Sequence, residues 1–338
     1  MGRSLLGVLA SQADLLRQRY DIVFQVVGAA DSTGAAVDPS GLGPALLLEA
    51  KRRGGVAGLP SIGRPGMSAV ELVQSTRATV VLESTPVDLR TAQPGLDVCR
   101  TALRRRTAVV LANKGPLALA YGELAGLSDL TDPRAPALRF SACVGGALPT
   151  VDLGRRVLAG ARVLKVEAVL NGTTQFILRE MEAGRTFGAV LAEAQRRGLA
   201  ETDPSLDVDG WDAAAKLVIV ANAVLKQPAT IRDVEVEGIG NVTPELLAAA
   251  LARGERVVLF CLAEPAGTRD GRFRLRVGPM ALPRAHPLAR MDAEEMGVVY
   301  YTDIAGRATA LTLERDPIPT ASAMLRDLLD VVGAIPNR

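Results

Sequence analysis

The sequence predicts an α/β protein with two domains, in which a doubly wound parallel sheet is followed by an α+β domain with a mostly antiparallel sheet. The chain has 338 residues, a length that corresponds to about two domains. In its first part, buried apolar runs alternate with helical patterns, as in consecutive βαβ units. After residue 150, strand-like segments with alternating or β-branched residues replace that alternation.

The elements of the first domain follow one another in a regular order. Apolar residues at helical spacing predict a helix over residues 2–20, and an apolar, β-branched run predicts a buried strand over 21–34. The next expected elements are a helix over 41–55 with a glycine stop, a strand over 78–86, a helix over 95–106, a strand leading into a helix over 107–119, and a strand entering a glycine-rich turn over 138–154.

The second domain begins with a strand, a polar turn and the start of a helix over residues 163–178. Further helices are expected over 186–198 and 211–226, and strands over 231–237, 256–263, 272–278 and 296–304. An amphipathic helix over 319–333 closes the pattern and ends on a glycine.

Composition excludes several classes of protein. Charged residues make up 22% of the chain and nearly cancel to a net charge of +2, which argues against a nucleic-acid-binding protein. No signal-peptide pattern and no apolar run long enough to span a membrane is present, so we expect neither secretion nor membrane insertion. The three cysteines are widely spaced and lack a metal-finger spacing, which fits a reducing cytoplasm.

The sequence offers only one histidine for acid–base catalysis. His286 is the only histidine, and its position between two prolines is typical of a surface loop. General acid–base chemistry in this chain therefore falls to carboxylates and lysines.

The densest group of charged residues is the stretch AETDPSLDVDGWDAAAKL, residues 200–217. Gly210 begins a strongly apolar helix on which Asp212 and Lys216 lie four residues apart, hence on one face. Two interpretations are open: a surface ion pair, or a partly buried face that binds a cation such as a substrate ammonium together with the carboxylates before it. A calcium loop is excluded, because aligning Gly210 with its sixth position places Lys216 where a bidentate glutamate is needed.

Segments spread along the chain resemble homoserine dehydrogenase: LANKGPLA, VGGALPT, LNGTTQFIL, AQRRGLAETDPSLDVDGWDAAAKL and PTASAMLRDLL. The resemblance implies the NAD(P)-dependent interconversion of L-homoserine and L-aspartate 4-semialdehyde, in the biosynthesis of threonine, methionine and isoleucine. It implies a Rossmann-like nucleotide-binding domain over residues 1–135, a catalytic and dimerisation domain over 136–312, and a C-terminal helix over 313–338 that returns to the first domain. The expected partners are the small-molecule substrate and a second copy in a homodimer, with no nucleic acid and no membrane.

The resemblance also implies roles for the charged residues of the second domain. Lys216 would be the general acid/base, and Lys114 would lie by the substrate oxygen and the nicotinamide. The remaining roles concern the substrate: Glu201 and Asp207 would bind its α-ammonium, Asp212 would orient Lys216 and the substrate, and Thr173, in the NGTT turn, would shape the pocket. Each lysine would need a pKa lowered by burial or by a neighbouring positive charge to act near neutral pH.

Cofactor-binding residues are expected at the carboxyl ends of the parallel strands, where α/β sheets bind ligands. Asn113, Lys114 and Thr85 occupy such ends, although simple turn residues are the alternative there. Asp31 ends the second strand of such a fold, where a carboxylate would hold an adenine-ribose hydroxyl and favour NAD, whereas Ser32 could tolerate the 2′-phosphate of NADP. The sequence leaves NAD and NADP both open.

A monovalent cation site is implied by the segment SACVGGALP. In some members of the family the carbonyls of the residues at Val144, Gly146 and Leu148 would bind Na+ or K+. The family often has a glutamate where this chain has Ser141, which weakens such a site, and a tight glycine turn is the alternative. A second departure is ERDPIPTASAM near the C-terminus, where many members have a GxGAG-like loop.

The phosphate-binding turn G-x-G-x-x-G of a dinucleotide fold is not found in the sequence. GRSLLGVL matches the helix that follows this turn in the family, so Gly2 would be its last glycine. We therefore expect the first strand and the first two glycines to lie upstream, with Met1 an internal methionine.

Two competing functions remain. One is an N-terminally truncated, catalytically impaired relative that binds homoserine or forms dimers, and the other is a dehydrogenase of a different amino-acid semialdehyde. The intact set of Glu201, Asp207, Asp212, Lys216 and Lys114 favours an active homoserine dehydrogenase over both.

Overall fold

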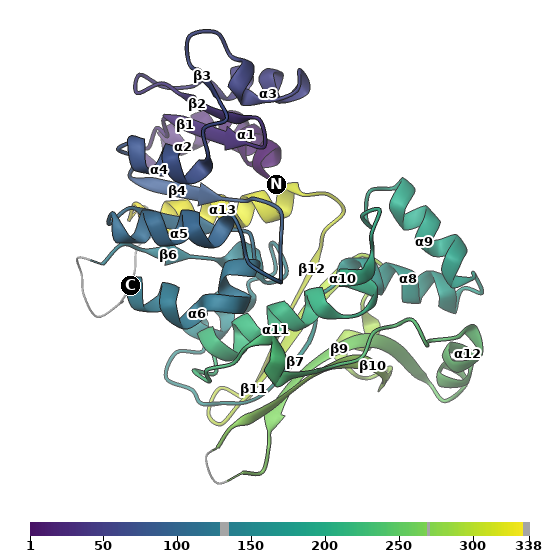
Figure 1. Cartoon of the computed structure of the whole chain (residues 1–338). Coiled ribbons are helices and arrows are strands. Elements are labelled where there is room, and N and C mark those ends of the chain that lie inside the picture. Colours follow the sequence, from purple (N-terminus) through teal and green to yellow (C-terminus); the bar gives the residue numbers. More distant parts are fainter. Residues whose placement is uncertain (129–134, 269–270, 334–338) are drawn as a thin grey trace. The chain divides into compact units, whose positions relative to one another are not determined.

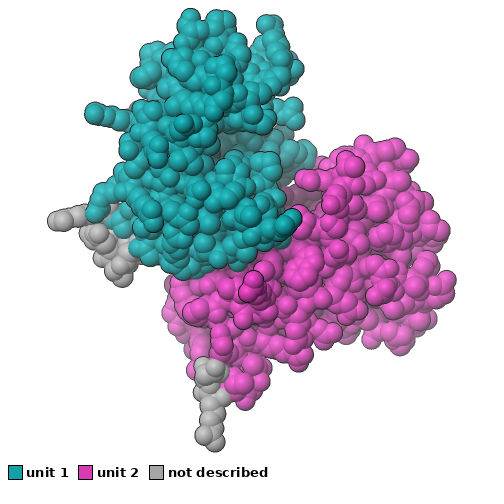
Figure 2. Space-filling model, in the orientation of Figure 1, with its two compact units in different colours: residues 1–143, 316–338 teal, residues 144–315 magenta. Residues whose placement is uncertain are grey.

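The structure, a computed structural model, describes residues 1–128, 135–268 and 271–333. The chain forms two compact units, which Figure 2 colours separately. The first unit comprises residues 1–143 and 316–338, and the second comprises residues 144–315. The boundaries expected from the sequence fall at residues 135 and 312 instead.

A three-stranded parallel sheet forms the centre of the first unit (Figure 1). Its strands lie in the order β4 (Val80–Glu83), β5 (Ala108–Leu111) and β6 (Leu138–Arg139). All four residues of β5 are buried, as the unbroken apolar run in the sequence indicates. Glu83 pairs with Leu111, so the residues that follow β4 and β5 leave the sheet at the same edge. The predicted α/β class is confirmed.

The strand expected over residues 21–34 is wrong for its first half. Only β1 (Gly28–Asp31) is a strand, and it forms a separate antiparallel sheet with β2 (Gly34–Val37) and β3 (Gly63–Pro65). Residues 21–27 have no ladder; the carbonyls of Val26 and Val27 accept single bonds from the loop residues Leu42 and Asp38. The apolar pattern there reflects burial alone, because Ile22 and Phe24 pack into the core of the first unit.

The helices of the first unit largely follow the prediction. The helix expected over residues 2–20 is divided at Gln12 into two helices. The helices are α1 (Gly2–Ser11), α2 (Ala13–Tyr20), α3 (Pro44–Arg52), α4 (Ala69–Ser75), α5 (Gly95–Arg104), α6 (Gly115–Leu127) and α13 (Ile318–Val331). Helix α4, which the sequence pattern did not single out, begins with a capping box between Ser68 and Glu71.

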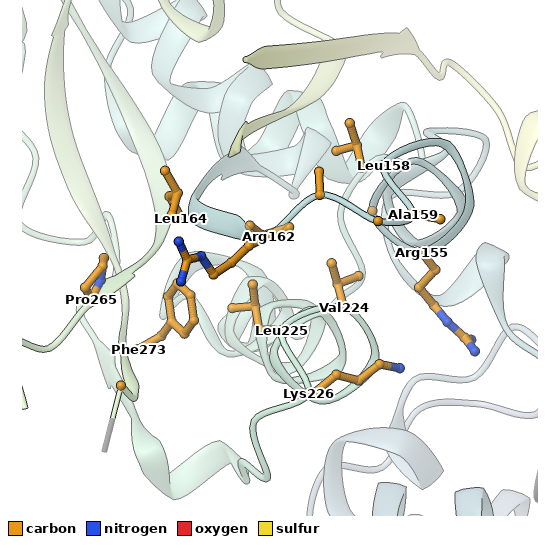
Figure 3. A pocket seen from close by; sticks show the side chains of 15 residues that line it. Arg155, Leu158, Ala159, Arg162, Leu164, Val224, Leu225, Lys226, Pro265 and Phe273 are labelled. Carbon is orange, nitrogen blue, oxygen red and sulfur yellow. The ribbon is translucent and has the colours of Figure 1, made fainter. Parts of the chain in front are cut away.

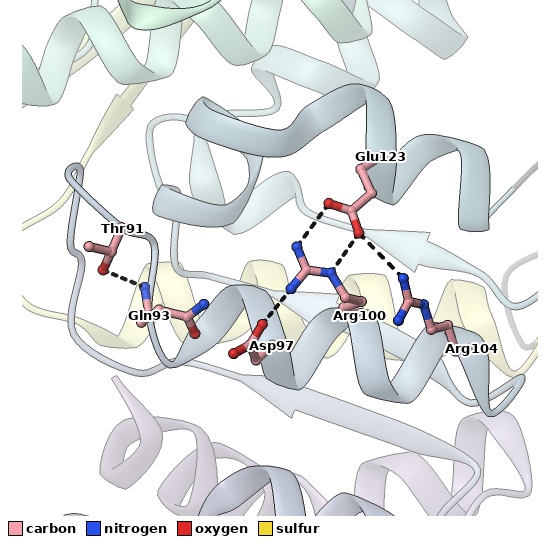
Figure 4. Close-up of polar contacts among 6 residues, drawn as sticks. All are labelled: Thr91, Gln93, Asp97, Arg100, Arg104 and Glu123. Atoms are coloured by element: carbon pink, nitrogen blue, oxygen red, sulfur yellow. Dashed lines mark hydrogen bonds and ion pairs between the residues drawn. The ribbon is translucent and has the colours of Figure 1, made fainter.

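Arg100 links two helices that flank β5 (Figure 4). Its guanidinium on α5 donates to both carboxylate oxygens of Glu123 on α6, at 2.6 and 2.9 Å, and also pairs with Asp97 one turn earlier on its own helix. The Arg100 side chain is 27% exposed, so this network orients α5 against α6 and contributes modestly to stability.

The core of the first unit joins the two ends of its chain. Residues of α1, β5 and α13 form one buried apolar cluster, which includes Leu5, Leu9, Val110, Met324 and Leu328. Helix α13 thereby packs on the same sheet as the opening helices, although some 300 residues separate them in sequence, an extreme case of non-local packing.

A six-stranded sheet dominates the second unit. Its order is β12 (Arg307–Leu313), β11 (Glu295–Thr302), β7 (Val163–Val169), β9 (Glu255–Pro265), β10 (Phe273–Pro283) and β8 (Val234–Val236). Only β10 and β8 pair in parallel, which confirms the predicted mostly antiparallel sheet. The helices are α7 (Thr150–Asp152), α8 (Gly172–Glu182), α9 (Phe187–Arg196), α10 (Ser205–Val208), α11 (Trp211–Ala223) and α12 (Pro244–Ala252). Strand β12 and helix α12 were not predicted.

His286 does not lie in a free surface loop, so that expectation is wrong. Its Nδ1 accepts from the Leu288 backbone N–H at the start of the short helix η5 (Pro287–Arg290), and its Nε2 lies 2.9 Å from Oε2 of Glu167 on β7. The Tyr301 hydroxyl donates to the same oxygen at 2.7 Å. The sole histidine therefore fastens η5 onto the face of the sheet that carries Glu167 and Tyr301, which is called the outer face from here on.

All three cysteines are free and buried: Cys99, Cys143 and Cys261. Burial raises the pKa of the Cys99 and Cys143 thiols well above the usual range and that of Cys261 to about 12. No helix among the described residues is both long and apolar enough to cross a membrane.

The packing of α13 can be tested with two substitutions on the same helix. Leu328→Ala removes a side chain that is 3% exposed, so we expect the free energy of unfolding to fall by about 2–5 kcal/mol. Ile318→Ala, at a position 56% exposed, should change it by less than about 0.5 kcal/mol. Both changes are measured by urea titration, with hydrogen exchange in peptides of the first unit as the readout of unfolding. An equal change in the free energy of unfolding for the two variants would contradict the proposed core.

Candidate active site

The charged face of α11 is partly buried. Gly210, with φ of 85°, turns the chain into the helix, and the apolar residues on either side of Lys216 pack inward. Lys216 Nζ lies 2.8 Å from Oδ2 of Asp212, and each of these side chains is only 12% exposed. The interpretation as a surface ion pair is therefore wrong. The Lys216 ammonium also donates to the backbone carbonyl of Leu170 at 2.5 Å, which ties α11 to the end of β7.

Asn171 joins three elements at this point. It follows β7 and caps α8, because its Oδ1 accepts from the Thr174 N–H at 2.8 Å. Its amide Nδ2 donates to Oδ1 of Asp207 at 2.6 Å and to Oδ2 of Asp212 at 2.8 Å. Asp207 lies on the short helix α10, which was not predicted. One side chain thus brings the two carboxylates together next to Lys216.

The role of Asn171 was missed at the sequence level. An asparagine before an amphipathic helix is a recognisable cap, and that signal is present in LNGTTQ. Its bonds to Asp207 and Asp212 join residues 36 and 41 positions apart, which no local pattern encodes.

Thr173 lies in the first turn of α8 and not in a free turn. Its hydroxyl donates to the Leu199 carbonyl at 2.7 Å. The Gln195 side chain holds the following backbone by bonds to the carbonyls of Glu201 and Thr202, both at 3.2 Å. The loop that carries Glu201 is thereby fixed at its base, while the Glu201 side chain itself is exposed and has no hydrogen bond or ion pair within the described ranges.

The arrangement suits a substrate with an ammonium group and a reactive oxygen. A lysine ammonium has three N–H bonds, and two are directed at Leu170 and Asp212, which leaves one for another acceptor. Asp207 and Asp212 supply carboxylate oxygens for a cation. An ammonium that can transfer a proton, on Lys216, thus lies next to carboxylates that can bind a cation, on Asp207 and Asp212.

A second group of polar residues lies at the carboxyl edge of the parallel sheet in the first unit. Asn113, after β5, donates through Nδ2 to Oγ1 of Thr85 at 3.1 Å and accepts through Oδ1 from the Gly115 N–H at 3.0 Å. Thr85, after β4, donates its N–H to Oε1 of Glu83 at 2.9 Å and also donates its hydroxyl there. Burial raises the pKa of Glu83, and the bonds from Thr85 oppose that shift. Lys114 occupies the N-cap position of α6 in the first unit without a capping bond from its side chain, whereas Lys216 belongs to the second unit.

Gly2 opens α1 beside this edge. A Cβ atom on Gly2 would lie 3.3 Å from Oγ of Ser84, so the N-terminal turn of the helix approaches the segment after β4 closely. The N–H groups of a first helical turn have no partners within the helix and attract anions.

Asp31 is engaged within its own unit. Its Oδ2 accepts from Lys51 at 2.6 Å and from the Val56 N–H at 3.1 Å, while its Oδ1 accepts from the N–H and hydroxyl of Thr33. Burial alone would raise its pKa, but the bonds from Lys51, Thr33 and Val56 outweigh it and lower the pKa to about 2. Asp31 ends a strand, but β1 belongs to the separate antiparallel sheet and not to the parallel sheet for which the prediction was made. The four hydrogen bonds of its carboxylate fix the loop after β1.

The segment Val144 to Leu148 forms a tight glycine turn. Gly145 and Gly146 have φ of 80° and 59°, in the left-handed region that favours glycine. The carboxylate of Glu314 accepts from the Ala147 N–H, and a Cβ on Gly146 would lie 2.2 Å from it. Ser141, where the family often has a glutamate, is bonded instead to Asp327 of α13 through its N–H and hydroxyl, both at 2.7 Å.

Comparisons with known proteins find one family. The family model described as homoserine dehydrogenase matches residues 149–329. A homoserine dehydrogenase of Methanocaldococcus jannaschii is 38% identical, with 99% of this chain and 96% of that protein covered. An NAD(+)-dependent homoserine dehydrogenase of Pseudomonas canavaninivorans is 30% identical over 98% of this chain and 93% of its own length. Among solved structures, a putative homoserine dehydrogenase from Archaeoglobus fulgidus superimposes with a TM-score of 0.83 at 32% identity, covering 98% and 95% of the two chains.

Asp31→Asn tests the electrostatics of the first unit. At pH 7 we expect the loss of the charged acceptor to lower the free energy of unfolding by about 1–3 kcal/mol. Because the folded-state pKa of about 2 lies below the ordinary value of 3.8, this stabilisation is complete above that value and is lost as the pH falls toward 2. The difference between wild type and variant should therefore be constant from pH 7 to 5 and fall to roughly half by pH 3. Urea titrations at several pH values measure this difference in the free energy of unfolding. A difference that is the same at pH 3 as at pH 7 would contradict stabilisation by the charged form of Asp31.

Proposed function

The chain belongs to the homoserine dehydrogenase family, and on that premise we propose how its side chains carry out the reaction. It is an NAD(P)-dependent oxidoreductase that interconverts L-homoserine and L-aspartate 4-semialdehyde. The observation that supports the assignment of roles best is the bonded series Asp207, Asn171, Asp212 and Lys216 at the buried start of α11.

Asp207 and Glu201 bind the α-ammonium of the substrate. The Asn171 amide donates to Oδ1 of Asp207 at 2.6 Å, which fixes the position of this carboxylate next to Asp212. Glu201 lies on the loop that Thr173 fixes at Leu199, and its exposed carboxylate reaches outward from that loop. Two carboxylates around one ammonium form charge-assisted hydrogen bonds, the strongest available to a small zwitterionic substrate.

Lys216 is the general acid and base. In the direction of reduction its third N–H donates to the aldehyde oxygen and passes it a proton; in the direction of oxidation the neutral amine takes the proton of the hydroxyl group. Asp212 and the Leu170 carbonyl fix the direction of the amine, so the side chain loses little freedom when substrate binds. Lys114 is proposed to lie by the substrate oxygen as well.

The first unit provides residues that fit a dinucleotide. The first turn of α1 at Gly2 attracts phosphate, Thr85 and Asn113 are held at the carboxyl edge of the sheet, and Asp31 is a carboxylate at the end of β1. NAD or NADP, when bound, accepts the hydride from the alcohol or donates it to the aldehyde. The residues named here bind and orient that cofactor. The relative from Pseudomonas is NAD(+)-dependent by name, and we leave NAD and NADP as equal candidates for this chain.

A Na+ or K+ ion bound by the carbonyls of Val144, Gly146 and Leu148 completes the proposal for the site. The carboxylate of Glu314, which bonds to the same turn, supports it by adding a negative charge beside those carbonyls.

We further propose a homodimer through the outer face of the six-stranded sheet, and a cytoplasmic location. Leu311 and Leu313 on β12 are exposed by 45% and 44%. A Cβ on the paired Gly297 would meet both Leu311 and Leu288 of η5, so Leu311 lies on the face to which His286 fastens η5. Exposed leucines in a row on a sheet favour burial against a second sheet. The three free thiols support a reducing compartment.

Lys216→Ala tests the proton-transfer role. We expect kcat for homoserine oxidation to fall by about 100- to 10,000-fold, because a positioned acid–base group contributes that much. The matched control is Arg253→Ala, which removes an exposed cation paired with Glu255 in the same unit and should leave kcat unchanged. Both are measured by the absorbance of the reduced cofactor with NAD+ and with NADP+. An active Lys216→Ala variant, or a wild-type protein without activity, would refute the mechanism.

Leu311→Glu tests the dimer. A carboxylate on the outer sheet face would be desolvated on association, so we expect sedimentation analysis to show a dimeric wild type and a monomeric variant. Leu246→Glu on α12, at a position 46% exposed, is the control that should remain dimeric. A monomeric wild type, or a variant that sediments like it, would exclude this interface.

A further inference from the structure

A cavity of about 700 Å³ lies within the second unit, beyond the C-terminal end of α11 (Figure 3). Its apolar floor comes from three places in the sequence: Leu158 after the π-helical turn, Val224 and Leu225 after α11, and Phe273 at the start of β10. Gly154 completes the floor, and it has no room for a side chain because a Cβ would lie 2.5 Å from Val224. No residue of the cavity belongs to the proposed homoserine site.

The charges around the cavity have one sign. Arg155, Arg162 and Lys226 line it, and among the residues that the structure describes no aspartate or glutamate belongs to the lining. In Figure 3, Val224 and Leu225 lie between the side chains of Arg162 and Lys226, so the cations border an apolar patch. Arg162 has an outside partner in Asp303, 3.6 Å away, and is largely exposed, which places it at the rim.

Lys226 is unusual in two respects. Its φ of 55° lies in the left-handed region, where a side-chain-bearing residue is strained and glycine is the ordinary choice after a helix. Its ammonium has no hydrogen bond or ion pair with any residue that the structure describes. Burial, and secondarily the charge of Arg155, lower its pKa. Lys226 thus occupies a position that favours glycine, faces another cation, and has no carboxylate partner among the described residues to compensate its charge.

We propose that this cavity binds a small organic anion that combines a carboxylate or phosphate with an aliphatic body. The anionic group would pair with Lys226 and Arg155, and the aliphatic part would cover Val224, Leu225 and Phe273. The same lining disfavours a free amino acid, since its ammonium would meet cations and find no carboxylate. The ligand class is therefore a simple organic anion and not a zwitterion.

The proposal is tested by saturation-transfer NMR on the full-length protein, with hexanoate and hexyl phosphate as probes and with hexylamine and L-norleucine as controls. We expect at least one anion to bind with a dissociation constant of about 1 mM or tighter, and the amine and amino acid to bind at least about tenfold more weakly. Comparison of the two anions shows whether the site prefers a carboxylate or a phosphate.

Three variants make the test specific. Lys226→Gly removes the ammonium and the backbone strain together, so the protein should melt no lower than wild type while its affinity for the anion falls at least about tenfold. Lys226→Glu should abolish binding, and Arg253→Ala should leave it unchanged. Absence of an anion signal at about 10 mM, equal binding of hexylamine, or unchanged affinity in a folded Lys226→Gly variant would overturn the proposal.

Discussion

The amide of Asn171 is the interaction on which the arrangement of the candidate active site depends. Asn171 lies two residues after the end of β7, where its side-chain oxygen caps α8 and its side-chain nitrogen donates to both Asp207 and Asp212. Two carboxylates this close repel each other, and the amide donor together with the Lys216 ammonium offsets that repulsion. One side chain thus brings together the start of α8, the short helix α10 and the Asp212–Lys216 pair of α11. An aspartate in its place would offer no donor and would add a third negative charge.

The first unit places two carboxylates in opposite environments. Asp31 receives four hydrogen bonds, one from an ammonium, and its charged form is favoured. Glu83 is buried under the polar edge of the sheet, and burial favours its neutral form. A carboxylate therefore fixes a loop at Asp31 and supports the Thr85–Asn113 contact at Glu83. Whether the charged or the neutral form is favoured depends on the balance between burial and the number of hydrogen-bond donors.

Sequence reasoning recovered most elements that carry a strong local signal. Fully apolar runs such as β5, and helices with clear stops such as α3, were predicted with nearly the observed bounds. The strand over residues 21–27 was wrong because a pattern of burial does not supply a hydrogen-bonding partner. In the site, the i,i+4 spacing predicted the Asp212–Lys216 pair, whereas the bond from Lys216 to Leu170 spans 46 residues and follows only from the packing of α11 on β7. The contacts divide the chain after residues 143 and 315, whereas the domains that the resemblance implies end at residues 135 and 312.

The burial of all three thiols has a practical consequence. Cys99, Cys143 and Cys261 are inaccessible and, with raised pKa values, carry almost no thiolate at neutral pH, which is the form that alkylating reagents attack. The native cysteines should therefore react very little with maleimides. One cysteine introduced on an exposed surface of each unit would accept a fluorophore or spin label selectively, so the distance between the two labels can be followed in solution without replacing any native cysteine.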